Sequence, residues 1–353
     1  MTERIRRIRN ILNEKKLDGL MLTGEVSRVY ATGLKSSSGV VLFTPKESIL
    51  ITDFRYIEAA RACSNGVYTV EQSGIERKAP DIVCEVMRRG KRLGVEADVL
   101  TMRSAESWKK GFKLIPVEDN LRALRAVKDP SEIERMREAQ RISEQTLTEV
   151  LPMLRPGVTE RAVCAEIVYR LLKNGAEKTS FDPIVASGPN GSKPHAEPTD
   201  RAIERGDFVT MDFGCVYKGY CSDMTRTVAI GEASEEMRKV YQIVLEAQKA
   251  GIAAAKAGVV GKNIDAIARK IIADAGYGGA FGHGFGHGLG LEIHEPPNAN
   301  PGETNPLPAG AVISAEPGIY LPGRFGVRIE DVIVLTETGC VNLTTAPKEL
   351  LVL

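Results

Sequence analysis

Two aspartates lie on either side of a predicted hairpin turn in the C-terminal half of the chain. The segment FVTMDFGCVYKGYCSDMTRTVAI alternates apolar and polar residues and breaks at Lys218-Gly219, a pattern typical of two strands joined by a tight turn. Folding there brings Asp212 and Asp223 to within a residue or two of facing positions, where side chains lie about 5 Å apart. Either aspartate alone could be a solvated hairpin residue. A half-buried pair of carboxylates persists when a cation lies between them or when one is protonated.

A second hairpin predicts a second acidic pair. The segment AVISAEPGIYLPGRFGVRIEDVIVL has its expected turn at residues 322–324, and Glu316 and Glu330 lie seven residues on either side of Gly323. The two glutamates would therefore face each other across the ladder. A single glutamate is more commonly a surface residue, but two facing acidic pairs on two hairpins indicate a common site.

Three of the four histidines in the chain lie within the stretch FGHGFGHGLGLEIHE. Glycine at every second position disfavours a helix, because each glycine costs about 1 kcal/mol relative to alanine. Read as an extended strand over residues 281–291, His283 and His287 share one face with apolar side chains, and the other face is glycine. Such a face allows another strand or a ligand to approach the backbone closely. The alternative is a glycine-rich loop with incidental histidines.

The charges of these residues indicate a metal site. The two acidic pairs supply four negative charges and His287 supplies a neutral imidazole, so two divalent cations would neutralise the set. A single divalent ion would leave two buried charges uncompensated, at a cost of several kcal/mol each. Oxygen ligands with one imidazole suit Mn²⁺, Co²⁺, Fe²⁺ or Zn²⁺. Two such ions about 3.5–4 Å apart are an arrangement used for hydrolysis.

Composition limits the kind of protein that carries this site. The 353 residues include 47 Lys plus Arg and 46 Asp plus Glu, so net charge gives no general reason to expect binding to nucleic acid or to anionic lipid. No apolar stretch is long enough for a spanning helix or a secretory signal. The six cysteines form no CxxC pair, which favours reduced thiols. We therefore expect a cytoplasmic protein that binds neither membranes nor nucleic acid.

The surrounding elements predict two domains. Strand and helix patterns alternate to about residue 118, as in an α/β domain, and we expect the boundary within residues 120–128. Asp129 and Pro130 have the types expected at the start of a long helix, and Thr159 has the type expected before the next one. Two further helices are predicted over about residues 235–257 and 263–275. The second domain is thus expected to be α+β, with two helix pairs alternating with antiparallel strands.

These motifs resemble a known enzyme family. The order of Asp212, Asp223, GHGLGLEIHE, AEPG and VRIED is similar to that of the pita-bread metallopeptidases, which include methionine aminopeptidase, aminopeptidase P and prolidase. SRVYATGLKSSS and ITDFRYIEAA resemble the creatinase-like N-terminal domain of the proline-specific members, although Ser27 stands where relatives often carry Asn. The resemblance covers essentially the whole chain. It implies a creatinase-like domain over residues 1–124 and a pita-bread catalytic domain over residues 125–353.

The resemblance also implies a role for each metal ligand. Asp212 would bind one ion, His287 and Glu316 would bind the other, and Asp223 and Glu330 would bridge the two. A hydroxide bound by both metals would attack the scissile carbonyl. Glu316 would carry a proton between this nucleophile and the leaving nitrogen.

Other residues are implied to contact the substrate. His195 and His294 resemble the histidines that bind the substrate carbonyl and stabilise the oxyanion, and His283 resembles a third histidine that lines the pocket. A packed, hydrogen-bonded histidine is the alternative for all three. Arg328 is expected either to pair with Asp223 in support of the metal site or to bind a substrate carboxylate. Tyr320 and Phe181 are expected either in the proline pocket or in the core.

The function implied by the resemblance is that of a dinuclear, metal-dependent Xaa-Pro dipeptidase or aminopeptidase. Its substrate would be a peptide with proline at the second position, its metal would be Mn²⁺ before the other candidates, and the chain would form a homodimer. Alternatives are a general or methionine-type aminopeptidase, a non-catalytic pita-bread binding protein, and a metal-free enzyme similar to creatine amidinohydrolase. The retained carboxylates argue against the last two.

Overall fold

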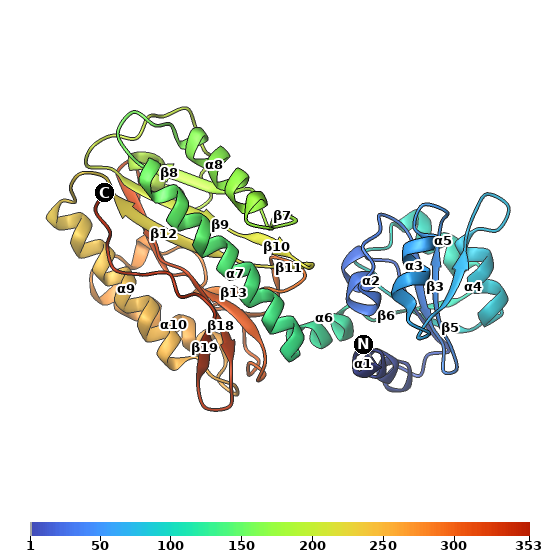
Figure 1. The fold of residues 1–353 in the computed structure, drawn as a ribbon. Coiled ribbons are helices and arrows are strands. Elements are labelled where there is room, and N and C mark those ends of the chain that lie inside the picture. The colour runs from blue at the N-terminus through green and yellow to red at the C-terminus, as the bar shows by residue number, and fades with distance from the viewer. Residues whose placement is uncertain (1) are drawn as a thin grey trace. The chain divides into compact units, whose positions relative to one another are not determined.

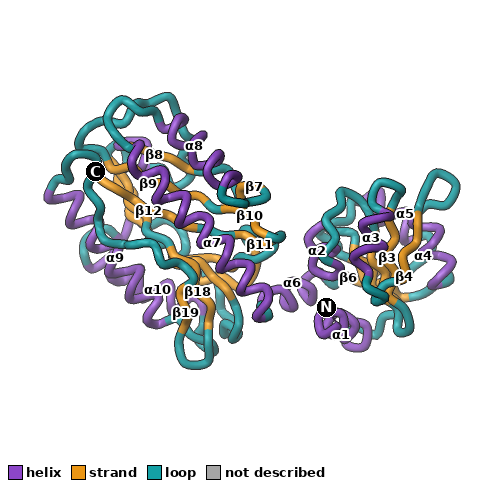
Figure 2. Tube along the Cα trace, in the orientation of Figure 1, coloured by secondary structure: helices purple, strands orange, loops and turns teal. Residues whose placement is uncertain are grey.

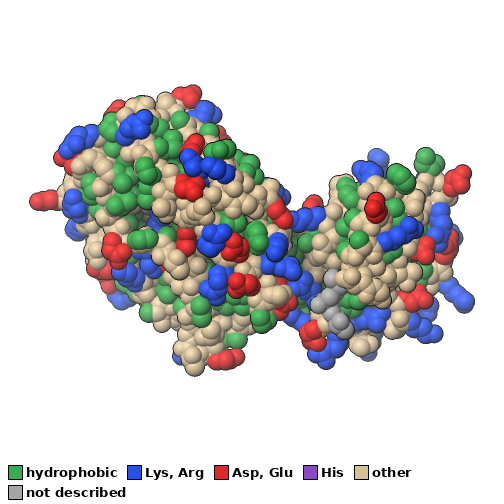
Figure 3. All heavy atoms as spheres, viewed as in Figure 1, with side chains coloured by type: hydrophobic (Ala, Val, Ile, Leu, Met, Phe, Trp, Pro, Cys, Tyr) green, Lys and Arg blue, Asp and Glu red, His purple; other side chains and the backbone are tan. Residues whose placement is uncertain are grey.

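The structure is a computed structural model that describes residues 2–353 and divides the chain into two compact units, Met1–Arg125 and Ala126–Leu353 (Figure 1). On the face seen in Figure 3, Lys and Arg side chains are mixed with Asp and Glu side chains over each unit. None of the helices within residues 2–353 is long and apolar enough to cross a bilayer.

The N-terminal unit is built around one six-stranded sheet with the order β4-β3-β2-β1-β5-β6. β2 runs antiparallel to β1 and β3, whereas the other neighbouring strands are parallel. The strands are β1 (Gly19–Leu22), β2 (Val40–Phe43), β3 (Ser48–Thr52), β4 (Thr69–Gln72), β5 (Arg92–Val95) and β6 (Lys113–Pro116). The helices are α1 (Thr2–Glu14), α2 (Glu25–Thr32), α3 (Ile57–Ser64), α4 (Ala79–Met87), α5 (Met102–Lys109) and α6 (Glu118–Ala126), the last of which reaches the division between the units. The predicted alternation of strands and helices is confirmed.

The C-terminal unit contains two helix pairs, each followed by antiparallel strands. The first set comprises α7 (Pro130–Val150), η1 (Leu151–Met153), α8 (Glu160–Lys173), β7 (Lys178–Thr179), β8 (Ile184–Ser187), η2 (Gly188–Ser192), β9 (Phe208–Phe213), β10 (Cys215–Tyr217), β11 (Tyr220–Cys221) and β12 (Met224–Ala229). The second set comprises α9 (Glu235–Ala254), α10 (Gly261–Asp274), η3 (Gly278–Ala280), β13 (Gly286–Gly288), β14 (Glu295–Ala299), β15 (Val312–Ala315), β16 (Gly318–Leu321), β17 (Phe325–Arg328), β18 (Asp331–Leu335) and β19 (Cys340–Asn342). The predicted two helix pairs are confirmed.

Each helix pair covers its own group of strands (Figure 2). Apolar side chains of α7 and α8 form one core with β8, β9 and β12, which are neighbours in the order β12-β9-β8. Side chains of α9 and α10 form a second core that includes residues of β15 and β18, two central strands of the sheet β14-β13-β15-β18-β19. The strands that carry the candidate ligands are thus backed by apolar packing on the helix side.

Local sequence signals account for the helix starts. The Asp129 carboxylate accepts hydrogen bonds from the backbone N–H groups of Ser131 (2.8 Å) and Glu132 (3.0 Å), and the Glu132 side chain accepts one from Asp129 N–H (2.8 Å). This reciprocal capping box satisfies donors that would otherwise lack partners in the first turn of α7. Thr159 Oγ1 accepts a bond from Ala162 N–H at the start of α8. The predicted caps are confirmed.

The prediction of one extended strand over residues 281–291 is wrong. Only β13, Gly286–Gly288, is a strand, and its pairing with β14 is irregular between Gly286 and Gly288. The predicted close approach of backbone is nevertheless observed. A Cβ atom on Gly286 would lie 2.0 Å from the carbonyl oxygen of Ser314, and one on Gly288 would lie 2.1 Å from that of Glu295. The neighbouring strands β14 and β15 therefore require glycine at residues 286 and 288 of β13. The irregular pairing of β13 with β14 ends the regular alternation of the strand.

Gly286→Ala should destabilise the protein by about 1–3 kcal/mol or more, because the added methyl group would clash with rigid backbone of β15. Gly282→Ala is the matched control, since no atom lies within 4 Å of a Cβ built there. Urea unfolding of the metal-free proteins measures both effects. Equal stability of the two variants would contradict the prediction.

Candidate metal centre

The first hairpin brings two aspartates to one cavity. Lys218 and Gly219 form its turn with φ angles of 46° and 85°, and Tyr217 pairs with Tyr220. Further along the same hairpin, Asp212 of β9 lies opposite Thr225 of β12, so Asp223 is displaced by two residues from the facing position. The prediction of a Lys218-Gly219 turn with the aspartates within a residue or two of register is confirmed.

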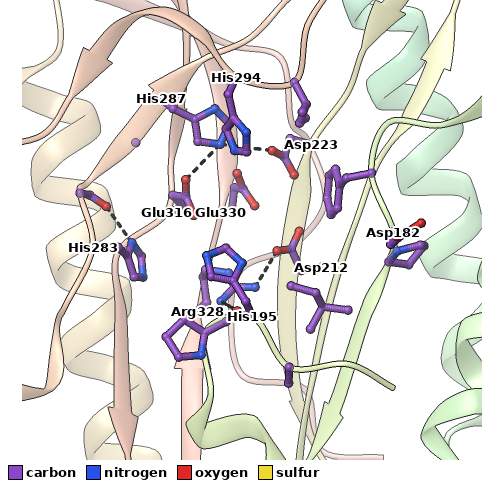
Figure 4. A pocket seen from close by; sticks show the side chains of 18 of the residues that line it. Asp182, His195, Asp212, Asp223, His283, His287, His294, Glu316, Arg328 and Glu330 are labelled. Atoms are coloured by element: carbon purple, nitrogen blue, oxygen red, sulfur yellow. Dashed lines mark hydrogen bonds and ion pairs between the residues drawn. The ribbon is translucent and has the colours of Figure 1, made fainter. Parts of the chain in front are cut away.

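The second hairpin places two glutamates opposite each other. Ala315 of β15 pairs with Asp331 of β18, and Gly318 of β16 pairs with Arg328 of β17. Glu316 and Glu330 occupy the corresponding positions between these strand pairs. The predicted register is confirmed, and both side chains line the same cavity as the aspartates (Figure 4).

His287 presents one ring nitrogen to the carboxylates. Its Nε2 atom lies 3.2 Å from Glu316 Oε1 and 3.5 Å from Asp223 Oδ2. On the other side of the ring, Nδ1 lies 3.1 Å from the carbonyl oxygen of Gly288, which can only accept a hydrogen bond. Nδ1 therefore carries the proton and Nε2 has a free lone pair, the form that binds a metal. Burial lowers the pKa of His287, which keeps the ring neutral.

Three carboxylate oxygens in this cavity lack any hydrogen-bond partner within the described chain. They are Asp212 Oδ1, Asp223 Oδ1 and Glu330 Oε1, and all are buried. Burial first, and then the negative charges of neighbouring acids, raise the pKa values of Asp223 and Glu330 well above their usual range. Burial also raises the pKa of Glu316. Buried acids that repel one another and have unused acceptor atoms fit divalent cations.

Ligand geometry supports the same interpretation. Asp223, His287 and Glu330 each offer a ligand atom, and these three atoms lie within 4.8 Å of one another. Glu316 adjoins this group through His287, and Asp212 adds a further oxygen to the cavity wall. A donor set of carboxylate oxygens with one imidazole is suited to first-row divalent metals.

Arg328 binds Asp212, and the expected pairing with Asp223 is wrong. Its Nη2 atom donates to Asp212 Oδ2 at 2.6 Å, Nη1 donates to Tyr320 Oη at 2.8 Å, and Nε donates to Thr225 Oγ1 at 3.0 Å. The register explains the difference, because Thr225 lies opposite Asp212 whereas Asp223 lies two residues further along. The Arg328 side chain is buried. It binds Oδ2 of Asp212, whereas Oδ1 is the oxygen that lacks a hydrogen-bond partner within the described chain.

The four histidines all line the cavity, which has a volume of about 500 Å³. The His294 ring packs edge-on against His287, with 4.3 Å between centroids. His283 Nε2 accepts a hydrogen bond from Tyr320 Oη at 2.8 Å, while its Nδ1 donates to the Gly284 carbonyl at 2.9 Å. His195 lies on the opposite wall, in the segment of residues 194–198 (Figure 4). The cavity thus brings together all nine predicted site residues.

One group at the site, the hydroxyl of Ser314, was not predicted. Ser314 Oγ accepts a hydrogen bond from His287 N–H at 2.9 Å and donates to Glu316 Oε1 at 3.0 Å, so it connects two candidate ligands. Its position two residues before Glu316, on the same strand face, was the available signal. Tyr320 connects His283 with Arg328 and is itself buried, whereas Phe181 lines the cavity.

Glu330→Gln should stabilise the metal-free protein, and the gain should grow as the pH rises above the usual glutamate pKa of about 4.3. With its raised pKa, folded Glu330 retains a proton that the unfolded chain has lost above about pH 4, so the free energy of unfolding of the wild type falls as the pH rises. The variant has no carboxyl group at this position, so this fall in the free energy of unfolding is absent from it. Urea unfolding with a chelator measures the difference, and added Mn²⁺ should stabilise the wild type more than the variant. A gain independent of pH would contradict the prediction.

Comparisons with known proteins agree with this geometry. Residues 134–337 match the family described as Metallopeptidase family M24, and residues 4–127 match the Creatinase/Prolidase N-terminal domain. A Pyrococcus furiosus protein named Xaa-Pro dipeptidase is 36% identical over 99% of this chain and 100% of its own length. Among solved structures, an Xaa-Pro dipeptidase from Bacillus anthracis has a TM-score of 0.95 at 42% identity, covering 100% of this chain and 99% of its own. An X-Pro aminopeptidase from Thermotoga maritima has a TM-score of 0.92 at 37% identity, covering 99% and 100%. With a creatinase-type domain preceding a pita-bread domain whose cavity is lined by buried carboxylates and histidines, the chain belongs to metallopeptidase family M24.

Proposed function

We propose that the chain is a metal-dependent Xaa-Pro peptidase, which hydrolyses the bond between an N-terminal residue and proline. The observation that carries the proposal is the group of three unpartnered, buried carboxylate oxygens in the cavity that His287 also lines. Relatives named for Xaa-Pro dipeptidase and X-Pro aminopeptidase activity, matched over nearly their whole length, support the choice of substrate.

Five residues would hold two divalent ions in this proposal, and Mn²⁺ is the first candidate. Asp212 would bind one ion, His287 and Glu316 the other, and Asp223 and Glu330 would be shared. When bound, such ions polarise a carbonyl oxygen and lower the pKa of water so that it can act as a nucleophile at neutral pH. Arg328 would keep Asp212 oriented, and Ser314 would do the same for Glu316.

Proton transfer is assigned to Glu316. Its half-buried carboxylate lines the cavity beside the other candidate ligands, and a carboxylate positioned in this way can both accept and return a proton. Ser314 Oγ holds one of its oxygens at 3.0 Å, which restricts the direction of transfer. Glu316 would take a proton as the nucleophile forms and deliver it to the leaving proline nitrogen.

The remaining histidines are assigned to the substrate. His195 and His294 would donate hydrogen bonds to the carbonyl oxygen as negative charge develops on it. His283 already uses both ring nitrogens, for Tyr320 and Gly284, which supports a role in shaping the pocket. The proline ring has no N–H to donate, so selectivity has to arise from pocket shape. Phe181, Pro194 and Pro198 supply rigid apolar surface in the cavity wall.

Three broader predictions belong to the proposal. The first places the domain boundary between residues 124 and 125, close to the division of the chain at Arg125 and Ala126. The second is a cytoplasmic location. It is supported by the six cysteines, all of which are free. The third is a homodimer, which light scattering on the purified protein would test.

Chelation should abolish hydrolysis of Ala-Pro and Ala-Pro-Gly, and Mn²⁺ should restore it, because the carboxylates alone provide no activated water. Metal analysis before and after chelation identifies the ions. The ratio of the two rates distinguishes a dipeptidase from an aminopeptidase. Full activity in metal-free protein would contradict the proposal and favour the creatine amidinohydrolase-like alternative. Metal binding without hydrolysis of either peptide, or of a methionyl peptide, would favour a binding protein.

His287→Ala should reduce metal-supported turnover by at least about a hundredfold, since loss of a direct ligand should exceed the effect of losing a supporting residue. The bound metal, measured by elemental analysis, should fall with it. His283→Ala is the control from the same segment and should retain its metal. Near-normal turnover and metal content in His287→Ala would show that this histidine is not a ligand.

A further inference from the structure

The position of His195 is set by the backbone of its loop. Its side chain makes no hydrogen bond to any other part of the described chain, and it is exposed at the cavity wall. The loop begins where β8 ends, at Ser187, passes through η2 and returns at Thr199. A histidine that contacts substrate from such a loop depends on whatever holds the two ends of the loop together.

Glu160, the first residue of α8, joins those two ends. Its side chain is fully buried, and Oε1 accepts hydrogen bonds from Ser187 N–H (2.6 Å) and Ser187 Oγ (2.7 Å). Oε2 accepts bonds from Thr199 N–H (2.9 Å), Thr199 Oγ1 (2.6 Å) and Asn190 Nδ2 (2.9 Å). Both oxygens therefore accept a hydrogen bond from a backbone N–H group.

The network extends from Glu160 towards His195. Asn190 Nδ2 also donates to the carbonyl oxygen of Glu197, two residues beyond the histidine, at 3.3 Å. On the other side, Arg328 Nη1 donates to the carbonyl oxygen of Pro194 at 3.1 Å. The backbone is thus held immediately before and shortly after His195, on one side by the arginine that binds Asp212 and on the other through Glu160.

Arg201 reaches the Glu160 carboxylate through a hydroxyl group, and Glu160 forms no direct ion pair within residues 2–353. Arg201 Nη1 donates to Ser187 Oγ at 2.7 Å, and this hydroxyl in turn donates to Glu160. Arg201 also pairs with Asp207 at 2.6 Å. The N-terminus of α8 adds favourable dipoles around the carboxylate. Donors from Ser187 reach one oxygen of Glu160, and donors from Thr199 and Asn190 reach the other, so this set of hydrogen bonds needs an acceptor with two equivalent oxygens.

We propose that Glu160 is a positioning residue, which holds the loop of residues 187–199 so that His195 faces the substrate cavity. The proposal rests on the proposed function in one respect, namely that His195 contacts the substrate. Glu160 itself lies behind the loop, outside the set of residues that line the cavity.

Glu160→Gln tests this proposal because it preserves size and removes one acceptor. In either orientation, the new NH₂ group would face a backbone N–H, that of Ser187 or that of Thr199, so the loop has to move. Glu132→Gln is the matched control. Glu132 is also a buried glutamate in the first turn of a helix, but its bonds go to Tyr220 and Asp129.

The first measurement is spectroscopic and does not depend on activity. The chain has only four histidines, so ¹⁵N-histidine labelling of the zinc-loaded enzyme gives few signals, and His195→Ala identifies the one of interest. We expect Glu160→Gln to shift or broaden the His195 signal, and Glu132→Gln to leave it unchanged. An unchanged His195 signal in folded Glu160→Gln would overturn the proposal.

The second measurement links the two residues in catalysis. We expect Glu160→Gln to lower kcat/KM for Ala-Pro or Ala-Pro-Gly by about tenfold to a hundredfold without loss of bound metal. Combined with His195→Ala, it should add little further loss, because both changes remove the same interaction. Losses that multiply in the double variant would overturn the proposal. If His195→Ala is itself fully active while Glu160→Gln shifts the His195 signal, the positioning role stands and the assigned role of His195 is wrong.

Discussion

Electrostatic repulsion among four carboxylates, three of them buried and one half-buried, is the constraint on which the catalytic unit depends. Asp223, Glu316 and Glu330 all have raised pKa values, chiefly because of burial, and oxygens of Asp212, Asp223 and Glu330 lack hydrogen-bond partners within the described chain. Such a group would be unstable as bare anions, since ion pairs and hydrogen bonds normally compensate buried charge. Divalent cations, which membership of metallopeptidase family M24 implies, would compensate these charges.

The scaffold holds the four acids at fixed positions, because each lies on a paired strand or within two residues of one. One hairpin supplies the two aspartates and a second hairpin supplies the two glutamates. Between β14 and β15 lies β13, where a side chain in place of Gly286 or Gly288 would clash with neighbouring backbone. Arg328 is a buried cation that binds the candidate ligand Asp212 directly, and it also reaches Tyr320 and the loop of His195. The candidate metal site, the Tyr320–His283 pair and the loop of His195 are therefore connected through a single guanidinium. Rigid support of this kind is what keeps ligands at fixed separations.

Much of the site could be predicted because its ligands lie on hairpins. Within a hairpin, the turn residues determine which positions face each other. Lys218-Gly219 and Gly323 were therefore sufficient to bring Asp223 to within two residues of the position facing Asp212 and to place Glu316 opposite Glu330. The predictions that failed involved longer-range geometry. A two-residue displacement placed Arg328 beside Asp212 and not Asp223, and a bulge confined the histidine strand to Gly286–Gly288. The position of Arg328 depends on how β17 lies against β12, and the bulge depends on how β13 aligns with β14, so neither leaves a local signature in the sequence.

The sequence by itself determined the helix starts, the two hairpins, the two-domain order and the identity of the candidate ligands, since these follow from local periodicity, capping and turn chemistry. Only the tertiary structure decided which acids lack partners, which acid the buried arginine binds, and how Glu160 reaches the loop of His195. Those properties depend on contacts between segments that are far apart in the chain. A carboxylate such as Glu160 reads in the sequence as an ordinary residue in the first turn of a helix, and its five hydrogen bonds exist only because α8, β8 and the returning loop meet around it.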